Sequence, residues 1–166
     1  MTEIRPETPD DADAVHAVTD AAFGRADEAD LVDRLRTLPG YLALVAVEAG
    51  EVVGHIAFTP VTVEPPRQAA MVGLAPMAVR PDRQRSGVGS RLVEAGLAAC
   101  RAAGAEAVVV LGHPDYYPRF GFEPASRWGL RDTYGALPEA FMAVELRPGA
   151  LDGDGGVVHY DPAFDA

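Results

Sequence analysis

The segment from Ala70 to Leu111 constrains the fold most, because it predicts two strands joined by one long helix. Ala70–Val79 is rich in apolar residues, Gly87–Ala103 carries apolar residues at helical spacing, and Ala107–Leu111 is a short apolar run typical of a buried strand. Two strands joined through a helix lie parallel in one sheet, with a right-handed crossover. The chain is therefore expected to form an α/β (mixed α+β) fold around this unit.

Antiparallel strands are expected beside this unit. Tyr41–Glu48 and Val52–Thr59 are β-rich runs joined by Ala49-Gly50-Glu51, which predicts a hairpin. The further elements predicted are a strand at Thr2–Arg5, helices from Thr8 to about Ala22 and over Asp27–Leu38, and strands at Phe141–Leu146 and Val157–Tyr160. The central sheet is thus expected to be mixed but mostly antiparallel, and the length predicts a single domain, residues 1–166.

The composition disfavours several classes of function. All 14 basic residues are arginine, and without lysine the chain has no Schiff-base chemistry, no pyridoxal-phosphate attachment and no P-loop. A net charge of −11 disfavours nucleic acid and anionic membranes as partners. The single Cys100 permits no intramolecular disulfide, the acidic N-terminal segment is unlike a signal peptide, and no apolar run approaches the roughly 18 residues of a membrane span. A cytoplasmic protein is therefore expected, and no metal ligands are assigned.

The stretch Met77–Leu92 leads from a strand through a turn into a helix whose first turn holds Gly87 and Gly89. Free backbone N–H groups at a helix N-terminus, with no Cβ in the way, can bind an anion. Residues 80–91 contain four Arg and one Asp, a local charge of +3 that favours a phosphorylated ligand. The alternative is an ordinary turn with solvated arginines. A P-loop needs the missing lysine, and a dinucleotide-binding loop needs a small residue where Leu92 stands.

Two motifs resemble one family. Gln84-x-x-Gly87-x-Gly89 resembles the acetyl-CoA pyrophosphate loop of the GNAT superfamily of N-acetyltransferases, and Asp115–Pro124 resembles the aromatic segment after the family's fifth strand. The order of predicted elements also agrees, so the resemblance covers essentially the whole chain and is closest to a bacterial subgroup with unassigned substrates. It implies a GNAT-like acyl-CoA N-acyltransferase fold with splayed central strands. Many members carry an asparagine after the fifth strand, whereas this chain has Gly112-His113-Pro114.

The resemblance also implies how acetyl-CoA, the co-substrate, is held. Backbone amides of residues 85–90 would bind the pyrophosphate, and the strand end Met77–Val79 would splay from the next strand and hydrogen-bond the pantetheine arm. Arg80, Arg83 or Arg85 could meet the 3′-phosphate. The expected cofactor-binding residues are Met77, Ala78, Val79, Gln84, Arg85, Ser86, Gly87, Val88, Gly89 and Ser90.

Tyr117 and His55 are the expected catalytic residues. Tyr117 lies four residues before Gly121, where the family's proton donor to the departing thiolate usually stands, and a phenol is protonated at neutral pH. The alternative for Tyr117 is packing against the cofactor or the core. His55, in the strand Val52–Thr59, could deprotonate the amine directly or through water, or it could be a satisfied strand histidine. The other candidate bases are His113, Glu64, Glu123, Asp115 and a water molecule.

The function expected from the resemblance is acetyl transfer from acetyl-CoA to a primary amine by direct attack. A non-catalytic acyl-CoA-binding or sensing domain on the same fold is the alternative. The acceptor is expected to be a small-molecule or peptide amine, and a homodimer is allowed for. Residues 1–40 hold ten Asp or Glu against four Arg, which favours a cationic acceptor, although these carboxylates could equally serve solvation.

Overall fold

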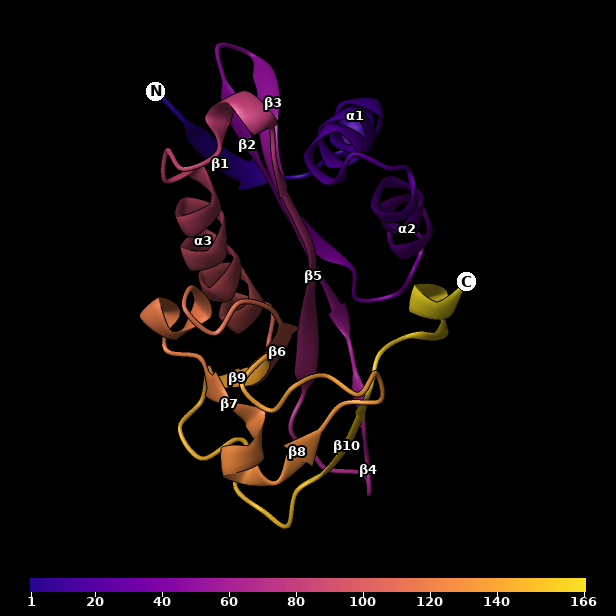
Figure 1. Ribbon diagram of the computed structural model, residues 1–166, viewed down its shortest axis with the longest axis vertical. Helices are drawn as coiled ribbons and strands as arrows, with labels where there is room; N and C mark the ends of the chain where they lie inside the picture. The colour runs from indigo at the N-terminus through magenta and orange to yellow at the C-terminus, as the bar shows by residue number, and fades with distance from the viewer.

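A seven-stranded sheet runs through the whole molecule (Figure 1). The structure, a computed structural model, describes all of residues 1–166. The strand order is β1-β2-β3-β5-β6-β9-β7, and every neighbouring pair is antiparallel except β5 and β6, which are parallel. The strands are Glu3–Pro6 (β1), Leu42–Glu48 (β2), Glu51–Pro60 (β3), Met71–Val79 (β5), Ala107–Leu111 (β6), Glu123–Pro124 (β7) and Phe141–Glu145 (β9). The predicted mixed, mostly antiparallel sheet with a parallel β-α-β crossover is confirmed.

A second sheet of three short strands was not predicted. It contains β4 (Thr62–Glu64), β10 (Gly156–His159) and β8 (Leu130–Arg131), with β10 antiparallel to β4 and parallel to β8. β4 and β8, with three and two residues, are too short to show a period in the sequence, which is why only β10 was expected. Apolar residues of the small sheet pack against the large sheet. Together they form a buried cluster that includes Val61, Met71, Val158 and Tyr160.

The helices cover both faces of the large sheet. In Figure 1, α3 lies on one side of the central strands, whereas α1 and α2 lie on the other, with the chain's C-terminus near α2. The α-helices are Ala12–Phe23 (α1), Asp27–Leu35 (α2) and Val88–Ala102 (α3), and the 3₁₀ turns are Pro9–Asp11 (η1), Pro81–Arg83 (η2), Tyr117–Phe120 (η3), Ala125–Trp128 (η4) and Pro162–Asp165 (η5). None of these helices combines the length and the apolar composition that crossing a bilayer requires.

The ends of the predicted elements differ from the structure at two helices. The first begins as the 3₁₀ turn η1, where Thr8 and Asp11 form a reciprocal capping box. The second ends at Leu35 rather than Leu38, and Leu38 is itself disfavoured in the helical region because it directly precedes Pro39. The predicted hairpin is confirmed: β2 and β3 are joined through Ala49 and Gly50, and both have positive φ, as a type I′ turn requires.

The two parallel strands separate part of the way along the sheet. β5 pairs with β6 only from Met71 to Leu74, opposite Ala107 to Val110. Beyond Leu74, β5 continues to Val79 beside β3 alone, while β6 ends at Leu111. This is the expected splay of the central strands. It leaves one edge of the Met77–Val79 segment without a strand partner.

The core beneath α3 holds this geometry in place. Ile56 and Phe58 of β3 pack with Leu92 of α3, and all three side chains are fully buried. Gly96 allows α3 to approach the sheet, since a Cβ there would lie 2.6 Å from the ring of Phe58. The N-terminus of α3 is thereby fixed beside the free part of β5.

Candidate active site

The N-terminus of α3 presents a row of free backbone amides. Its first hydrogen bond runs from the amide of Arg91 to the carbonyl of Gly87, and no amide of residues 85–90 donates to a carbonyl in the surrounding turns. Gly87 has a φ of 92° and Arg85 a φ of 63°, both in the left-handed region, which turns the loop back toward the helix axis. Consecutive amides at a helix N-terminus favour a bound anion. We call residues 85–90 the anion cradle.

The side chains around the anion cradle tie it to β5. The Gln84 side-chain amide donates to the carbonyl of Val79 at 3.0 Å, and the Ser86 hydroxyl donates to the carbonyl of Arg83. A Cβ on Gly89 would lie 3.3 Å from the hydroxyl of Tyr116 and 3.7 Å from side-chain atoms of Met77 and Val79. The cradle and the free edge of β5 are therefore contiguous.

Of the three arginines considered for the 3′-phosphate, two are already paired. Arg80 contacts Asp82 at 2.6 Å and Glu51 at 3.3 Å, and Arg83 contacts Glu48 at 2.6 Å. Arg85 forms no salt bridge and is exposed. Its guanidinium is the one that a phosphate could engage without displacing a carboxylate.

A pocket of about 610 Å³ opens where β5 and β6 separate. Its walls come from residues 74–77 of β5, residues 110–113 at the end of β6, Tyr117, three side chains of the α1–α2 pair (Phe23, Glu28 and Leu31), Ala136, Ala140 and the C-terminal Phe164. We call it the gap pocket. Its lining is mostly apolar, and Met77 belongs both to this lining and to the surroundings of Gly89 in the cradle.

Tyr117 lies at the wall of the gap pocket with a protonated hydroxyl. Its ring is 8% exposed and packs edge-to-face against Tyr116 and Phe122, with centroid distances of 5.1 and 5.5 Å. Burial, with a smaller contribution from Tyr116, raises the pKa of Tyr117 to about 12. The phenol is therefore a proton or hydrogen-bond donor across the physiological pH range.

The side chain of Tyr116 makes structural contacts on both its hydroxyl and its ring. Its hydroxyl lies 3.1 Å from that of Ser90, and the guanidinium of Arg119 lies 4.7 Å from the centre of its ring. The contact with Ser90 joins η3 to the N-terminus of α3. The aromatic segment thus connects the cradle to the gap pocket.

His55 lies at the centre of a buried polar network and does not line the gap pocket. Its side chain is fully buried, and its Nε2 lies 2.7 Å from Glu7 and 3.3 Å from the hydroxyl of Tyr41. Glu7 also accepts a hydrogen bond of 2.9 Å from Arg36. Burial acts to raise the pKa of Glu7, but hydrogen bonds from His55 and Arg36 outweigh it and lower the pKa. Direct deprotonation of an amine by His55 does not fit this placement, because the ring is fully buried and an amine substrate cannot reach it.

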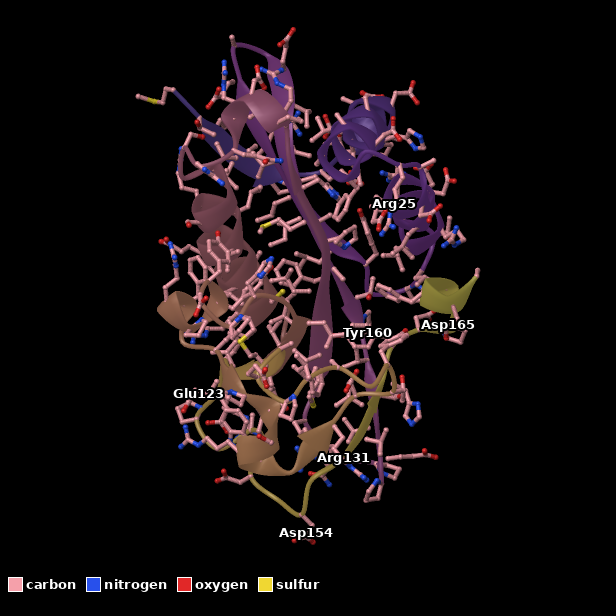
Figure 2. The ribbon with its side chains drawn as sticks, in the orientation of Figure 1. Arg25, Glu123, Arg131, Asp154, Tyr160 and Asp165 are labelled. Carbon is pink, nitrogen blue, oxygen red and sulfur yellow. The ribbon has the colours of Figure 1, made fainter.

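The structure separates the other candidate bases. His113 is exposed and lines the gap pocket. Glu64 contacts His159 in the small sheet at 3.1 Å, and Glu123 pairs with Arg127. Figure 2 shows Glu123 beside β7, away from the helices that border the pocket. Asp115 is exposed and is not part of the pocket lining, so His113 alone among these side chains faces the gap.

Glu28 was not among the candidates from sequence. Its side chain is 17% exposed, lines the gap pocket and receives a bidentate contact from Arg25, with the shortest distance 2.6 Å. That hydrogen bond lowers the pKa of Glu28, so the carboxylate is charged at neutral pH. Figure 2 shows Arg25 between α1 and α2. Sequence spacing revealed the helix but gave no signal that this one carboxylate faces the gap between two distant strands.

Cys100 does not contribute a nucleophile. It is 1% exposed within the core beneath α3, and burial raises the pKa of its thiol to about 12. A neutral, enclosed thiol is unreactive.

The splayed strands, the anion cradle and the aromatic segment together define an acyl-CoA-type acetyltransferase. A family model described as an acetyltransferase (GNAT) domain matches residues 3–125, and the chain belongs to this family. The expected family and fold are thus confirmed.

Two bacterial proteins are similar to this chain over nearly its whole length. It is 38% identical over 164 residues, 97% of both chains, to the uncharacterized N-acetyltransferase YhbS of Escherichia coli K12. The crystal structure of E. coli YhbS in complex with CoA superimposes with a TM-score of 0.91, covering 99% of this chain and 92% of that one at 37% identity. A GNAT family acetyltransferase of Brucella melitensis in complex with acetyl-CoA gives 0.80 at 38% identity, covering 99% of both chains.

Proposed function

We propose that this protein transfers an acetyl group from acetyl-CoA to a primary amine. The observation that carries the proposal is the continuity between the anion cradle and the gap pocket. Gly89 approaches Met77 and Val79 on the free edge of β5, and Met77 in turn lines the pocket. The complexes of related proteins with CoA and acetyl-CoA support the same ligand here.

The cradle would hold the pyrophosphate, and Arg85 the 3′-phosphate. Amides of residues 85–90 are charge-complementary to the pyrophosphate, since each is a fixed donor at the positive end of the α3 dipole. Beyond it, the edge of Met77–Val79 that lacks a strand partner can hydrogen-bond an extended pantetheine arm as a missing strand would. An amide of this segment would also polarise the acetyl carbonyl.

Two side chains of the gap pocket would carry out the proton transfers of the reaction. In the reaction, a neutral amine nitrogen forms a bond to the carbonyl carbon, and the bond from that carbon to sulfur breaks. We assign removal of the amine's proton to His113, directly or through one water, because it is the one candidate base that lines the pocket. Tyr117 would donate a proton or hydrogen bond to the departing sulfur. His55 is then a structural residue that holds Glu7.

The test combines binding and turnover. Calorimetry with acetyl-CoA measures the cofactor site, and thiol release against a panel of primary amines measures transfer. Binding together with amine-dependent thiol release supports the proposal. Tight binding without turnover on any amine would instead favour the alternative, a non-catalytic acyl-CoA-binding domain.

A cytoplasmic location is part of the proposal, resting on the single cysteine, which permits no intramolecular disulfide. A homodimer stays a prediction.

A further inference from the structure

Large apolar side chains are exposed around the gap pocket. Five large apolar residues of the chain are exposed, and two of them, Phe23 at 41% and Leu111 at 37%, line this pocket. Two more, Tyr134 and Leu137, flank Ala136 on the segment that forms part of its wall. Exposed apolar side chains in the wall of a concave site mark a place that a ligand covers.

The pocket contains a single carboxylate. Arg25 donates two hydrogen bonds to one oxygen of Glu28 and one to the other, and a carboxylate has about four acceptor positions, so one remains open. The only other titratable side chains in the lining are His113 and Tyr117. One amino group can therefore be hydrogen-bonded by Glu28, whereas a second positive charge in the pocket would find no partner.

The remaining acidic residues of the first 40 lie elsewhere. Glu7 and Asp11 are buried in pairs with Arg36 and Arg5, and the other seven do not line the gap pocket. The negative charge of residues 1–40 is thus not concentrated in the pocket where an acceptor would react. A polycation would therefore gain little binding free energy from the pocket itself.

We propose that the acceptor is a small primary amine with an apolar, otherwise uncharged body, such as an alkylamine or arylalkylamine. Glu28 accepts a hydrogen bond from its amino group, and Phe23, Leu31 and Phe164 contact its body. The inference rests on the proposed function, since it names the substrate class of the same site. A volume of about 610 Å³ admits such a molecule beside the end of the pantetheine arm.

The first experiment measures kcat/KM by thiol release for n-alkylamines from propylamine to hexylamine, with spermidine and glucosamine as polycationic and polar comparisons. Each methylene buried in the apolar wall should raise kcat/KM by about fourfold. Hexylamine should exceed spermidine and glucosamine by at least about tenfold. A flat alkylamine series, or a preference for spermidine or glucosamine, overturns the inference.

The second experiment compares Glu28→Gln with Asp27→Asn. Both changes remove one negative charge from the first turn of α2, but Asp27 is exposed and lies outside the pocket. Glu28→Gln should raise KM for hexylamine by about tenfold or more, with KM for acetyl-CoA and the melting temperature of the acetyl-CoA complex little changed. Asp27→Asn should leave all three near wild type. Equal effects of the two variants on KM for hexylamine overturn the assignment of Glu28.

The outcomes separate the two claims. If acetyl-CoA binds and no amine releases thiol, the proposed function fails and the substrate class fails with it. If amines are acetylated but the preference is polar or polycationic, the proposed function stands and the substrate class alone is refuted.

Discussion

Replacing Gly89 by valine tests the anion cradle directly. Gly89 is the second residue of α3, and its amide is one of the free donors that face the proposed pyrophosphate. A Cβ there already lies 3.3 Å from the Tyr116 hydroxyl, so the added methyl groups of valine have to turn toward the space in front of the amides. Losing two charge-assisted amide hydrogen bonds at about 1.5 kcal/mol each removes about 3 kcal/mol, which weakens acetyl-CoA binding about 150-fold.

The assay is titration calorimetry with acetyl-CoA, accompanied by thermal unfolding of the free protein. Valine is a better helix residue than glycine by a few tenths of a kcal/mol, so the unfolding temperature should stay close to wild type. Ala102→Val is the matched control, because it places the same side chain in the same helix at an exposed position far from the cradle. A Gly89→Val variant that stays folded and binds acetyl-CoA within about threefold of wild type would refute the reasoning.

Three further variants test the remaining roles. Tyr117→Phe should lower kcat by about ten- to a thousandfold while KM for acetyl-CoA changes little, and wild-type turnover would assign Tyr117 to packing alone. His113→Ala should lower kcat by about a hundredfold while KM for acetyl-CoA changes little, and wild-type turnover would rule out His113 as the base. Glu7→Gln should lower the free energy of unfolding by about 3 kcal/mol at neutral pH, because Arg36 loses the buried carboxylate with which it pairs and His55 loses the same hydrogen-bond partner. Since the folded-state pKa of Glu7 lies below its ordinary value of 4.5, its contribution is present above that pH and disappears as the pH falls through the lowered pKa. Chemical denaturation of both proteins from neutral to acidic pH should therefore show the difference shrinking, and a difference independent of pH would contradict the role of the ionised carboxylate.

The backbone geometry of the proposed cofactor site could be predicted from sequence, because it is made of neighbouring residues. The cradle depends on Gly87, on Gly89 and on the helix that follows, and all of these lie within one short segment. The hairpin through Ala49 and Gly50 was equally local. Such features follow from spacing and backbone preference, which a sequence displays directly.

The acceptor half could not be predicted in the same way. Glu28 and Phe164 are 136 positions apart in the sequence, and only the packing of η5 against α2 brings both to the gap pocket. The sequence predicts that His55 lies in a strand. It does not predict the contacts of His55 with Glu7 and Tyr41, because these residues come from other parts of the chain. Long-range packing decided which polar residues became enclosed and which stayed accessible.

Gly112, the residue directly after β6, lies close to the ring of Tyr117, the proposed proton donor. Any side chain at Gly112 would overlap the ring of Tyr117, since an added Cβ there coincides with the ring edge. The missing side chain at the end of β6 and the close packing of Tyr117 against that strand are therefore one structural feature. At this point the wall of the gap pocket includes the aromatic ring of Tyr117 and the side chain of His113. An apolar wall with a phenol and an imidazole suits an acceptor that brings one amino group and little other polarity.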